Sequence, residues 1–168
     1  MRLLFCLLYI PAMGILAHMI GEALPRKWFN PEAWPFAPYK FEQNGRIYDK
    51  LAVRRWKDRL PDMSKVMHDM TRKSVSMSQG SKHAENVVRE TCVAETVHWV
   101  LMLLSWLIYR IYACTLGAII AIVYALSHIP FIIIQRYNRP TLLLLAKRLK
   151  QREERILHEN TDIVGEHR

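Results

Sequence analysis

Glu95 and His98 are the side chains that most clearly suggest chemistry, because they lie inside an apolar stretch where charge is costly. They are three residues apart, so on a helix they share one face and can touch. A carboxylate beside an imidazole fixes its tautomer and raises its basicity, as a general base that removes a hydroxyl proton requires. The spacing therefore predicts a catalytic pair. The alternative is two hydrogen-bonded groups that only help helices to pack.

A second cluster, residues 135–140 (QRYNRP), follows the last apolar run. Its two guanidinium groups and its amides can hold an anion or stabilise a developing oxyanion. We predict that Arg136 and Asn138 take part in catalysis and that Arg139 binds substrate. Ordinary anchoring of a membrane helix by interfacial arginines is the alternative. Asn138 and Pro140, which is expected to stop the helix, favour a shaped site.

A third cluster is basic and aromatic and covers residues 54–59 (RRWKDR). Arg54, Trp56 and Lys57 are predicted to bind an anionic substrate such as the phosphates of coenzyme A. A solvated basic face against anionic lipid explains the cluster equally well. His18 and His128 are isolated in apolar runs, and we interpret both as structural residues.

Motifs of the common hydrolase, kinase and dehydrogenase sites are absent from the sequence. It has no GxSxG elbow, no Walker or GxGxxG loop, no HExxH and no His-x4-Asp pair. The three cysteines, Cys6, Cys92 and Cys114, match no metal or redox spacing. We therefore expect no metal ion and no tightly bound cofactor.

The composition points to a membrane as the partner of this basic chain. The 168 residues include 24 Lys and Arg against 15 Asp and Glu, for a net charge of +9. Half of the residues are hydrophobic and they occur in long runs, whereas no nucleic-acid-binding motif is present. The lipid bilayer, rather than nucleic acid, is the expected partner.

The apolar runs predict an all-α integral membrane protein with one domain, 1–168, and about three transmembrane helices. The expected spans are 3–24, 91–109 and 111–135, with a tight turn at Arg110, since about 20 apolar residues cross a bilayer. The first run also resembles a cleaved signal peptide, but it is long for one, and we favour a retained helix.

The polar parts set the expected orientation. The segment 25–90 holds 14 Lys and Arg, and the chain after residue 135 holds eight. The positive-inside rule places both in the cytoplasm and the N-terminus outside. Within them we predict interfacial amphipathic helices over 46–60 and after Pro140 (140–168, with a polar tail), and a Ser-rich loop over 71–83.

Together these clusters resemble the glycosyl-4,4'-diaponeurosporenoate acyltransferase family, bacterial membrane enzymes of staphyloxanthin-type carotenoid biosynthesis. The matching stretches occur in one order over about residues 40–155. They are Phe41-Glu42 with Gly45, Val53 to Lys57, Glu90-Thr91 with Ala94-Glu95 and His98-Trp99, and Ile132 to Pro140 with Leu142, Leu145, Lys150, Arg152 and Glu154-Arg155. The resemblance adds Glu90 to the candidate substrate-binding residues.

The resemblance implies transfer of a fatty acyl group from an acyl thioester, acyl-CoA or acyl carrier protein, to a sugar hydroxyl of a glycosylated carotenoid. His98, oriented by Glu95, is then expected to remove the hydroxyl proton. Arg136, Asn138 and Arg139 would stabilise the oxyanion or hold the donor. Acyl transfer to another glycolipid or phospholipid is the main alternative. A non-catalytic membrane partner subunit and a small membrane methyltransferase are the others.

Overall fold

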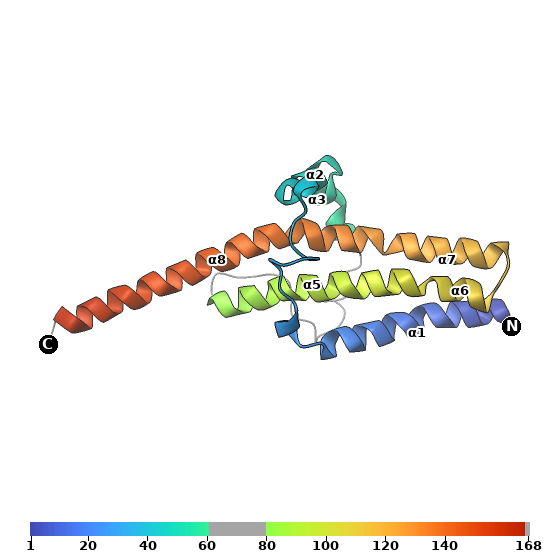
Figure 1. Ribbon diagram of the computed structural model, residues 1–168, viewed down its shortest axis with the longest axis horizontal. Helices are drawn as coiled ribbons and strands as arrows, with labels where there is room; N and C mark the ends of the chain where they lie inside the picture. The colour runs from blue at the N-terminus through green and yellow to red at the C-terminus, as the bar shows by residue number, and fades with distance from the viewer. Residues whose placement is uncertain (61–79, 167–168) are drawn as a thin grey trace.

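The computed structural model describes residues 1–60 and 80–166, and within these ranges the chain is entirely helical apart from its connecting turns. Three long helical columns lie side by side (Figure 1). They are α1 (Arg2–Ala23), α5 (Gly80–Leu104) continued by α6 (Trp106–Ile111), and α7 (Thr115–Ser127) continued by α8 (Ile129–Glu166). The predicted all-α architecture is confirmed.

Each column contains a helix long and apolar enough to cross a membrane: Arg2–Ala23, Gly80–Ile111 and Thr115–Glu159. Packing within the bundle buries only some of the apolar side chains. α1 and α7 leave a large share of them exposed, among them Leu4, Phe5, Leu8, Ile15, Ile119, Ile122 and Val123. A helix that is apolar on every side needs an apolar environment on every side, which a bilayer provides.

The N-terminus lies at the same end of the bundle as the turn between α6 and α7 (Figure 1). At this end Cys6, Ile108 and Ala121 from three helices form a small buried core. The turn itself is at Tyr112 to Cys114, slightly later than the predicted turn at Arg110. Gly117 is required there, because a Cβ on it would lie 1.8 Å from the Tyr112 carbonyl oxygen.

The third column bends where α7 ends and α8 begins, at His128. Pro130 explains the break, since it has no N–H to donate to the carbonyl four residues earlier and its ring crowds that carbonyl. Pro140, in contrast, lies inside α8. The prediction that Pro140 stops the helix is therefore wrong, whereas the interfacial position of the residues after it stays a prediction. The basic residues after Pro140 lie on a continuous extension of the third column (Figure 1).

The α5 helix begins at Gly80, about ten residues before the predicted span. The carboxylate of Glu153 on α8 caps this start by accepting from the Ser81 backbone N–H at 2.7 Å and from its hydroxyl at 2.5 Å. A carboxylate is well placed there because the N-terminal N–H groups of a helix lack partners. The predicted Ser-rich loop falls mainly on residues 61–79, which are outside the described residues.

Between α1 and the gap the chain forms short helices: η1 (Arg26–Trp28), η2 (Lys40–Gly45), α2 (Arg46–Lys50), α3 (Val53–Trp56) and η3 (Lys57–Arg59). The single amphipathic helix predicted over 46–60 is wrong. Ala52 adopts a left-handed conformation with φ of 50°, which breaks the helix between α2 and α3. We call residues 40–59 the lobe; it packs on the side of α8 (Figure 1).

Candidate active site

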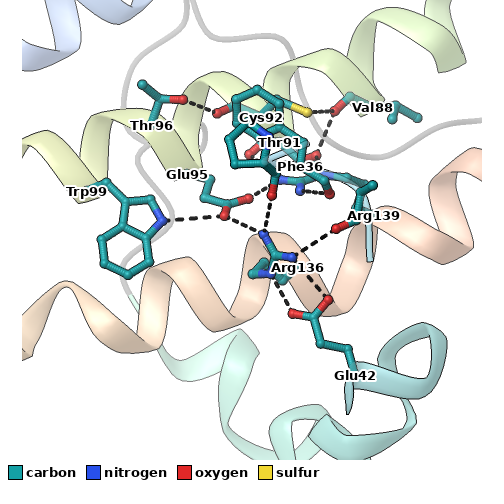
Figure 2. A network of polar contacts seen from close by, with 12 residues as sticks. Phe36, Glu42, Val88, Thr91, Cys92, Glu95, Thr96, Trp99, Arg136 and Arg139 are labelled. Carbon is teal, nitrogen blue, oxygen red and sulfur yellow. Dashed lines mark hydrogen bonds and ion pairs between the residues drawn. The ribbon is translucent and has the colours of Figure 1, made fainter. Parts of the chain in front are cut away.

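The centre of the site is a buried ion-pair network between α5 and α8, shown in Figure 2. Glu95 on α5 accepts from Arg136 Nη1 at 2.7 Å and from Arg139 Nη2 at 2.6 Å, using one carboxylate oxygen for each. The Trp99 indole N–H also points at this carboxylate, at 3.4 Å. The spacing of the arginines places both on one face of α8, opposite Glu95.

Arg136 joins this helix pair to the lobe. Its Nε and Nη2 donate to the two oxygens of Glu42, at 2.5 and 3.1 Å. The remaining contacts are to the carbonyls of Pro35 and Ala37, at 3.2 and 3.1 Å. With the bond to Glu95, all five N–H groups of this guanidinium are engaged. A role for Arg136 as oxyanion donor would require one of these bonds to open.

Arg139 is hydrogen-bonded almost as fully as Arg136, and it is only 1% exposed. Its Nε donates to the Thr91 hydroxyl at 2.8 Å, and Nη2 donates to the Thr91 carbonyl at 3.1 Å as well as to Glu95. Nη1 donates to the carbonyl of Phe36 at 2.7 Å. Both arginines therefore hold the 35–42 segment against α5 and α8.

The network balances its charges with two arginines and two glutamates. Buried ions are tolerated when each is paired and hydrogen-bonded. At Glu42, burial by itself would raise the pKa, but hydrogen bonds from Arg136, the Tyr48 hydroxyl and the Tyr39 N–H outweigh it and lower the pKa below its ordinary value. The Tyr48 pKa is raised by burial and by the same carboxylate.

The network lies where the apolar bundle meets the polar segment. α1 ends at Ala23, and its Gly21 faces Val97 and Val93, close to Glu95 in sequence. Arg26, just beyond α1, donates to the last carbonyls of that helix and pairs with Glu90 at 2.5 Å. These contacts place Glu95, Arg136 and Arg139 at the boundary of the apolar bundle, with His98 about one turn deeper.

His98 lies in a second polar contact, with His128 at the junction of α7 and α8. The two Nδ1 atoms are 3.3 Å apart. The ring of His98 stacks on Phe131 with centroids 4.8 Å apart, and Tyr124 lies edge-on to His128 at 4.7 Å. His128 is buried, and its Nε2 has no hydrogen-bond partner in the described structure. His128 is therefore alone in its apolar run but not in space, and its interpretation as a structural residue stays a prediction.

The predicted second and third clusters meet. Lys57 Nζ donates to the Asn138 side-chain oxygen at 3.2 Å and lies 5.2 Å from the centre of the Tyr137 ring. Arg54 is exposed beside it, whereas Trp56 donates its indole N–H to the Leu51 carbonyl. The cluster is thus an accessible basic edge of the lobe, next to the buried network.

The predicted residues fall into three groups in space. Glu95, Arg136 and Arg139 meet in the network; Lys57 and Asn138 meet at its edge; and Glu90 lies apart in its ion pair with Arg26. Sequence reasoning missed Glu42 and His128 as members of the site. Glu42 stands in one of the stretches that carry the family resemblance, but nothing in its spacing predicted its partner. That Glu95 orients His98 stays a prediction, and its carboxylate is shared with two arginines.

In the described residues, no group of three or more His, Cys, Asp or Glu side chains could hold a metal ion. The imidazole of His98 is the group of the site whose chemistry suits proton transfer.

Comparison with known proteins identifies the kind of protein. Residues 25–148 match the CrtO family model, described as glycosyl-4,4'-diaponeurosporenoate acyltransferase. The chain belongs to this family. Relatives of that name from Staphylococcus aureus strains bovine RF122 / ET3-1, N315 and USA300 are each 31% identical over 153 residues, which is 90% of this chain and 92% of theirs. The expected family is confirmed, and with it an acyltransferase activity. No solved structure matches the chain.

The part of the chain that matches the CrtO family model contains both polar clusters of the site. Glu42, Glu95, Arg136 and Arg139 of the network lie within residues 25–148, as do His98 and His128. The site described above is therefore part of the acyltransferase region, not an addition to it.

Proposed function

We propose that this chain transfers a fatty acyl group from an acyl thioester to a sugar hydroxyl of glycosyl-4,4'-diaponeurosporenoate at the cytoplasmic face of a bacterial membrane. The observation that carries the proposal is the match over 90% of the chain to relatives named for this activity. Three helices able to cross a membrane suit substrates with long apolar tails. The polar site at the end of the apolar bundle suits a reaction at the head of such substrates.

In the proposed reaction His98 accepts the proton of the sugar hydroxyl as the oxygen attacks the thioester carbonyl. A C–O bond forms and the C–S bond breaks. The proton on His98 passes to the leaving thiolate, so the products are an ester and a free thiol. His98 suits this role because it lies deeper in the bundle than the ion network and next to a second imidazole. Asn138 lies seven residues beyond Phe131 on α8, about 10 Å along the helix from the level at which Phe131 stacks on His98, so we propose that its amide binds the head of the donor at the edge of the lobe.

The ion network has a positioning role in this proposal. Arg136 and Arg139 hold the 35–42 segment in place through Glu42, Glu95 and backbone carbonyls. A substrate anion would have to compete with these bonds. We therefore propose that the donor's phosphates bind at the accessible Arg54 and Lys57. Arg136 and Arg139 hold the elements of the site together.

The cytoplasmic orientation is supported by the charge distribution. The N-terminus and the α6–α7 turn lie at one end of the bundle, and the basic segment and the α8 extension lie toward the other (Figure 1). Positive residues concentrate on the cytoplasmic side of membrane proteins. A cytoplasmic site also has access to acyl thioesters made in the cell.

The proposal is tested with purified chain in nanodiscs, supplied with an acyl-CoA and glycosyl-4,4'-diaponeurosporenoate, with products measured by mass spectrometry. We expect the pigment to gain the mass of one fatty acid less one water. His98→Ala should lower the rate by about 10²-fold or more, the usual contribution of a general base. His18→Ala, a histidine in α1 at a distance from the network in sequence, is the matched control.

Two results would contradict the proposal in different ways. If the pigment is unchanged but a glycolipid or phospholipid in the same nanodisc gains the acyl chain, the acceptor is wrong and the alternative acyltransferase reaction is right. If folded His98→Ala transfers the acyl group at the wild-type rate, the assignment of His98 as the general base is wrong.

A further inference from the structure

The part of α8 beyond Pro140 carries an exposed basic face. Residues 147–155 include five Lys and Arg but only two Glu. Arg148, Arg152 and Arg155 are four and three residues apart, so they share one side of the helix and line one shallow hollow on it. All three are exposed, and none forms an ion pair within the residues that the structure describes. We call these three residues the arginine face.

The arginine face lies beyond the level at which the apolar bundle ends. Arg152 is thirteen residues after Arg139 of the buried network, which at about 1.5 Å per residue is about 20 Å along the helix. The headgroup layer on one side of a bilayer is only about 5–8 Å thick. α8 continues without a break through Pro140 and extends past the start of α5 (Figure 1). In a chain whose third column crosses the membrane, the arginine face therefore extends into the aqueous phase.

The arginine face is aligned with the basic edge of the lobe. Tyr137 precedes Arg148 by eleven residues, which is about three helical turns, so the two side chains lie on the same side of α8. Lys57 Nζ lies 5.2 Å from the centre of the Tyr137 ring. Between these two levels, Thr141 and Leu144 lie on the same side of the helix and are exposed. One side of α8 therefore has cations at both ends of an exposed stretch about 16 Å long.

We propose that the arginine face binds an acidic acyl carrier protein, which presents the fatty acyl group as a thioester on its phosphopantetheine arm. The inference rests on the proposed acyl transfer and specifies its donor. The carrier protein binds at the arginine face, and its arm follows the exposed side of α8 toward Lys57, whose ammonium group suits the phosphate of the arm. The acyl carbon forms a C–O bond with the sugar oxygen and its C–S bond breaks. The hydroxyl proton passes to the sulfur, so the arm leaves as a free thiol.

The extent of the basic surface favours a protein donor over a small one. Arg54 and Lys57 suffice for the phosphates of coenzyme A, and the arginine face would then have no role. Three unpaired guanidinium groups on one side of a helix attract an acidic surface and set its orientation, because complementary charges steer two proteins together. Glu159, one turn after Arg155, limits the face at its far end. An anionic lipid surface is the other partner that suits a basic helix, but α8 would have to bend at Pro140 to lie on it.

The test measures binding of a bacterial acyl carrier protein, loaded with palmitate as a thioester, to the purified chain in phosphatidylcholine nanodiscs. The glutamine variant combines Arg148→Gln, Arg152→Gln and Arg155→Gln, which removes the charge of the arginine face. The lysine variant has lysine at the same three positions and keeps the charge. KM and kcat for transfer to glycosyl-4,4'-diaponeurosporenoate are then measured with palmitoyl carrier protein and with palmitoyl-CoA.

The matched control removes the same number of exposed cations from the polar segment between α1 and the gap. It combines Lys27→Gln, Arg46→Gln and Lys50→Gln. A loss of affinity that came only from the net charge of the chain would be equal in this control and in the glutamine variant.

We expect the glutamine variant to bind the carrier protein about tenfold more weakly than the wild type, and the lysine variant and the control to bind it within about twofold of the wild type. Wild-type binding should weaken as sodium chloride is added, since salt screens exposed charges. The glutamine variant should raise KM by about tenfold for palmitoyl carrier protein but by less than about twofold for palmitoyl-CoA.

The inference is overturned if the glutamine variant binds the carrier protein as tightly as the wild type does, which would leave the arginine face to the lipid surface. It is also overturned if the control loses as much affinity as the glutamine variant, or if the wild type does not bind the carrier protein. Binding needs no acceptor and no turnover, so it decides the inference separately from the reaction. A wild type that transfers no acyl group from either donor would overturn the proposed function instead.

Discussion

Glu95 on α5 and Arg136 on α8 meet at 2.7 Å between side chains that are 3% and 8% exposed. This contact joins the two helices at the level where the apolar bundle ends. It also connects the bundle to the lobe, because the same guanidinium holds Glu42. The consequence is that the segment over the site is held by charge pairing, so its stability should depend on each charge in the network.

Removal of one charge from this network should be strongly destabilising. We expect Glu95→Gln to lower the free energy of unfolding by about 3–5 kcal/mol, since it leaves a buried arginine without its counter-ion. The measurement is thermal unfolding in one detergent, with Glu32→Gln as the control. Glu32 pairs with Lys147 on the surface, where both side chains are more than half exposed, and its loss should cost less than about 1 kcal/mol. Equal effects of the two variants would contradict the buried network.

The lowered pKa of Glu42 predicts a loss of stability in acid. Above the ordinary carboxyl pKa of 4.5, Glu42 is ionised in both states and its stabilisation is complete. As the pH falls below that value, the unfolded chain takes up a proton first, so stability decreases until the folded pKa is reached. Unfolding measured between pH 7 and pH 3 should show a smaller acid loss in Glu42→Gln than in the wild type. Parallel curves for the two proteins would contradict this assignment.

Gly45 lies where the lobe contacts α8 and has a left-handed backbone conformation. Its φ is +95°, and a Cβ there would lie 3.6 Å from the Tyr137 carbonyl oxygen and 3.8 Å from Pro140. Gly45→Ala should therefore cost about 1 kcal/mol or more through backbone strain. Gly14→Ala is the matched control, since nothing lies within 4 Å of a Cβ there and alanine favours the helix by about 0.5–1 kcal/mol. The two substitutions should have opposite signs in thermal unfolding; the same sign would be incompatible with the described backbone.

The basic edge of the lobe should affect donor binding more than chemistry. Lys57→Met removes a cation that contacts Asn138, and we expect it to raise KM for acyl-CoA by about fivefold, which corresponds to about 1 kcal/mol. The rate at saturating donor should change little, because Lys57 is not assigned to the reacting atoms. Lys27→Met, an exposed lysine just after α1, is the control. An unchanged KM in Lys57→Met would place the donor elsewhere.

The sequence predicts well the elements that depend on the local pattern of apolar and polar residues. Long apolar runs have one stable solution in a bilayer, so the three columns follow from hydropathy. Lys57 is predicted to bind substrate and Asn138 to take part in catalysis, and the two are in contact although 81 positions separate them in the sequence. Pro140 shows the limit of local rules, since packing of α8 against α5 and Gly45 keeps the helix continuous through a residue that ordinarily ends it.

The partners within the site could not be predicted because they depend on tertiary packing. Glu95 and His98 share a helix face as expected. The arginines that donate hydrogen bonds to the Glu95 carboxylate, however, lie 41 and 44 positions away in the sequence. His128, at the junction of α7 and α8, contacts His98 on α5, which lies 30 positions away in the sequence. Periodicity places a residue on a face of its own helix. It does not determine which residue of another helix lies opposite.

The central claim is that this chain adds one fatty acyl group to a glycosylated carotenoid, and lipid mass spectrometry tests it most directly. Cells that make glycosyl-4,4'-diaponeurosporenoate would be compared with and without the gene for this chain, and with the gene carrying His98→Ala. The account predicts a pigment heavier by one fatty acid less one water only with the wild-type gene. A pigment of unchanged mass in cells that contain the folded wild-type protein would contradict it.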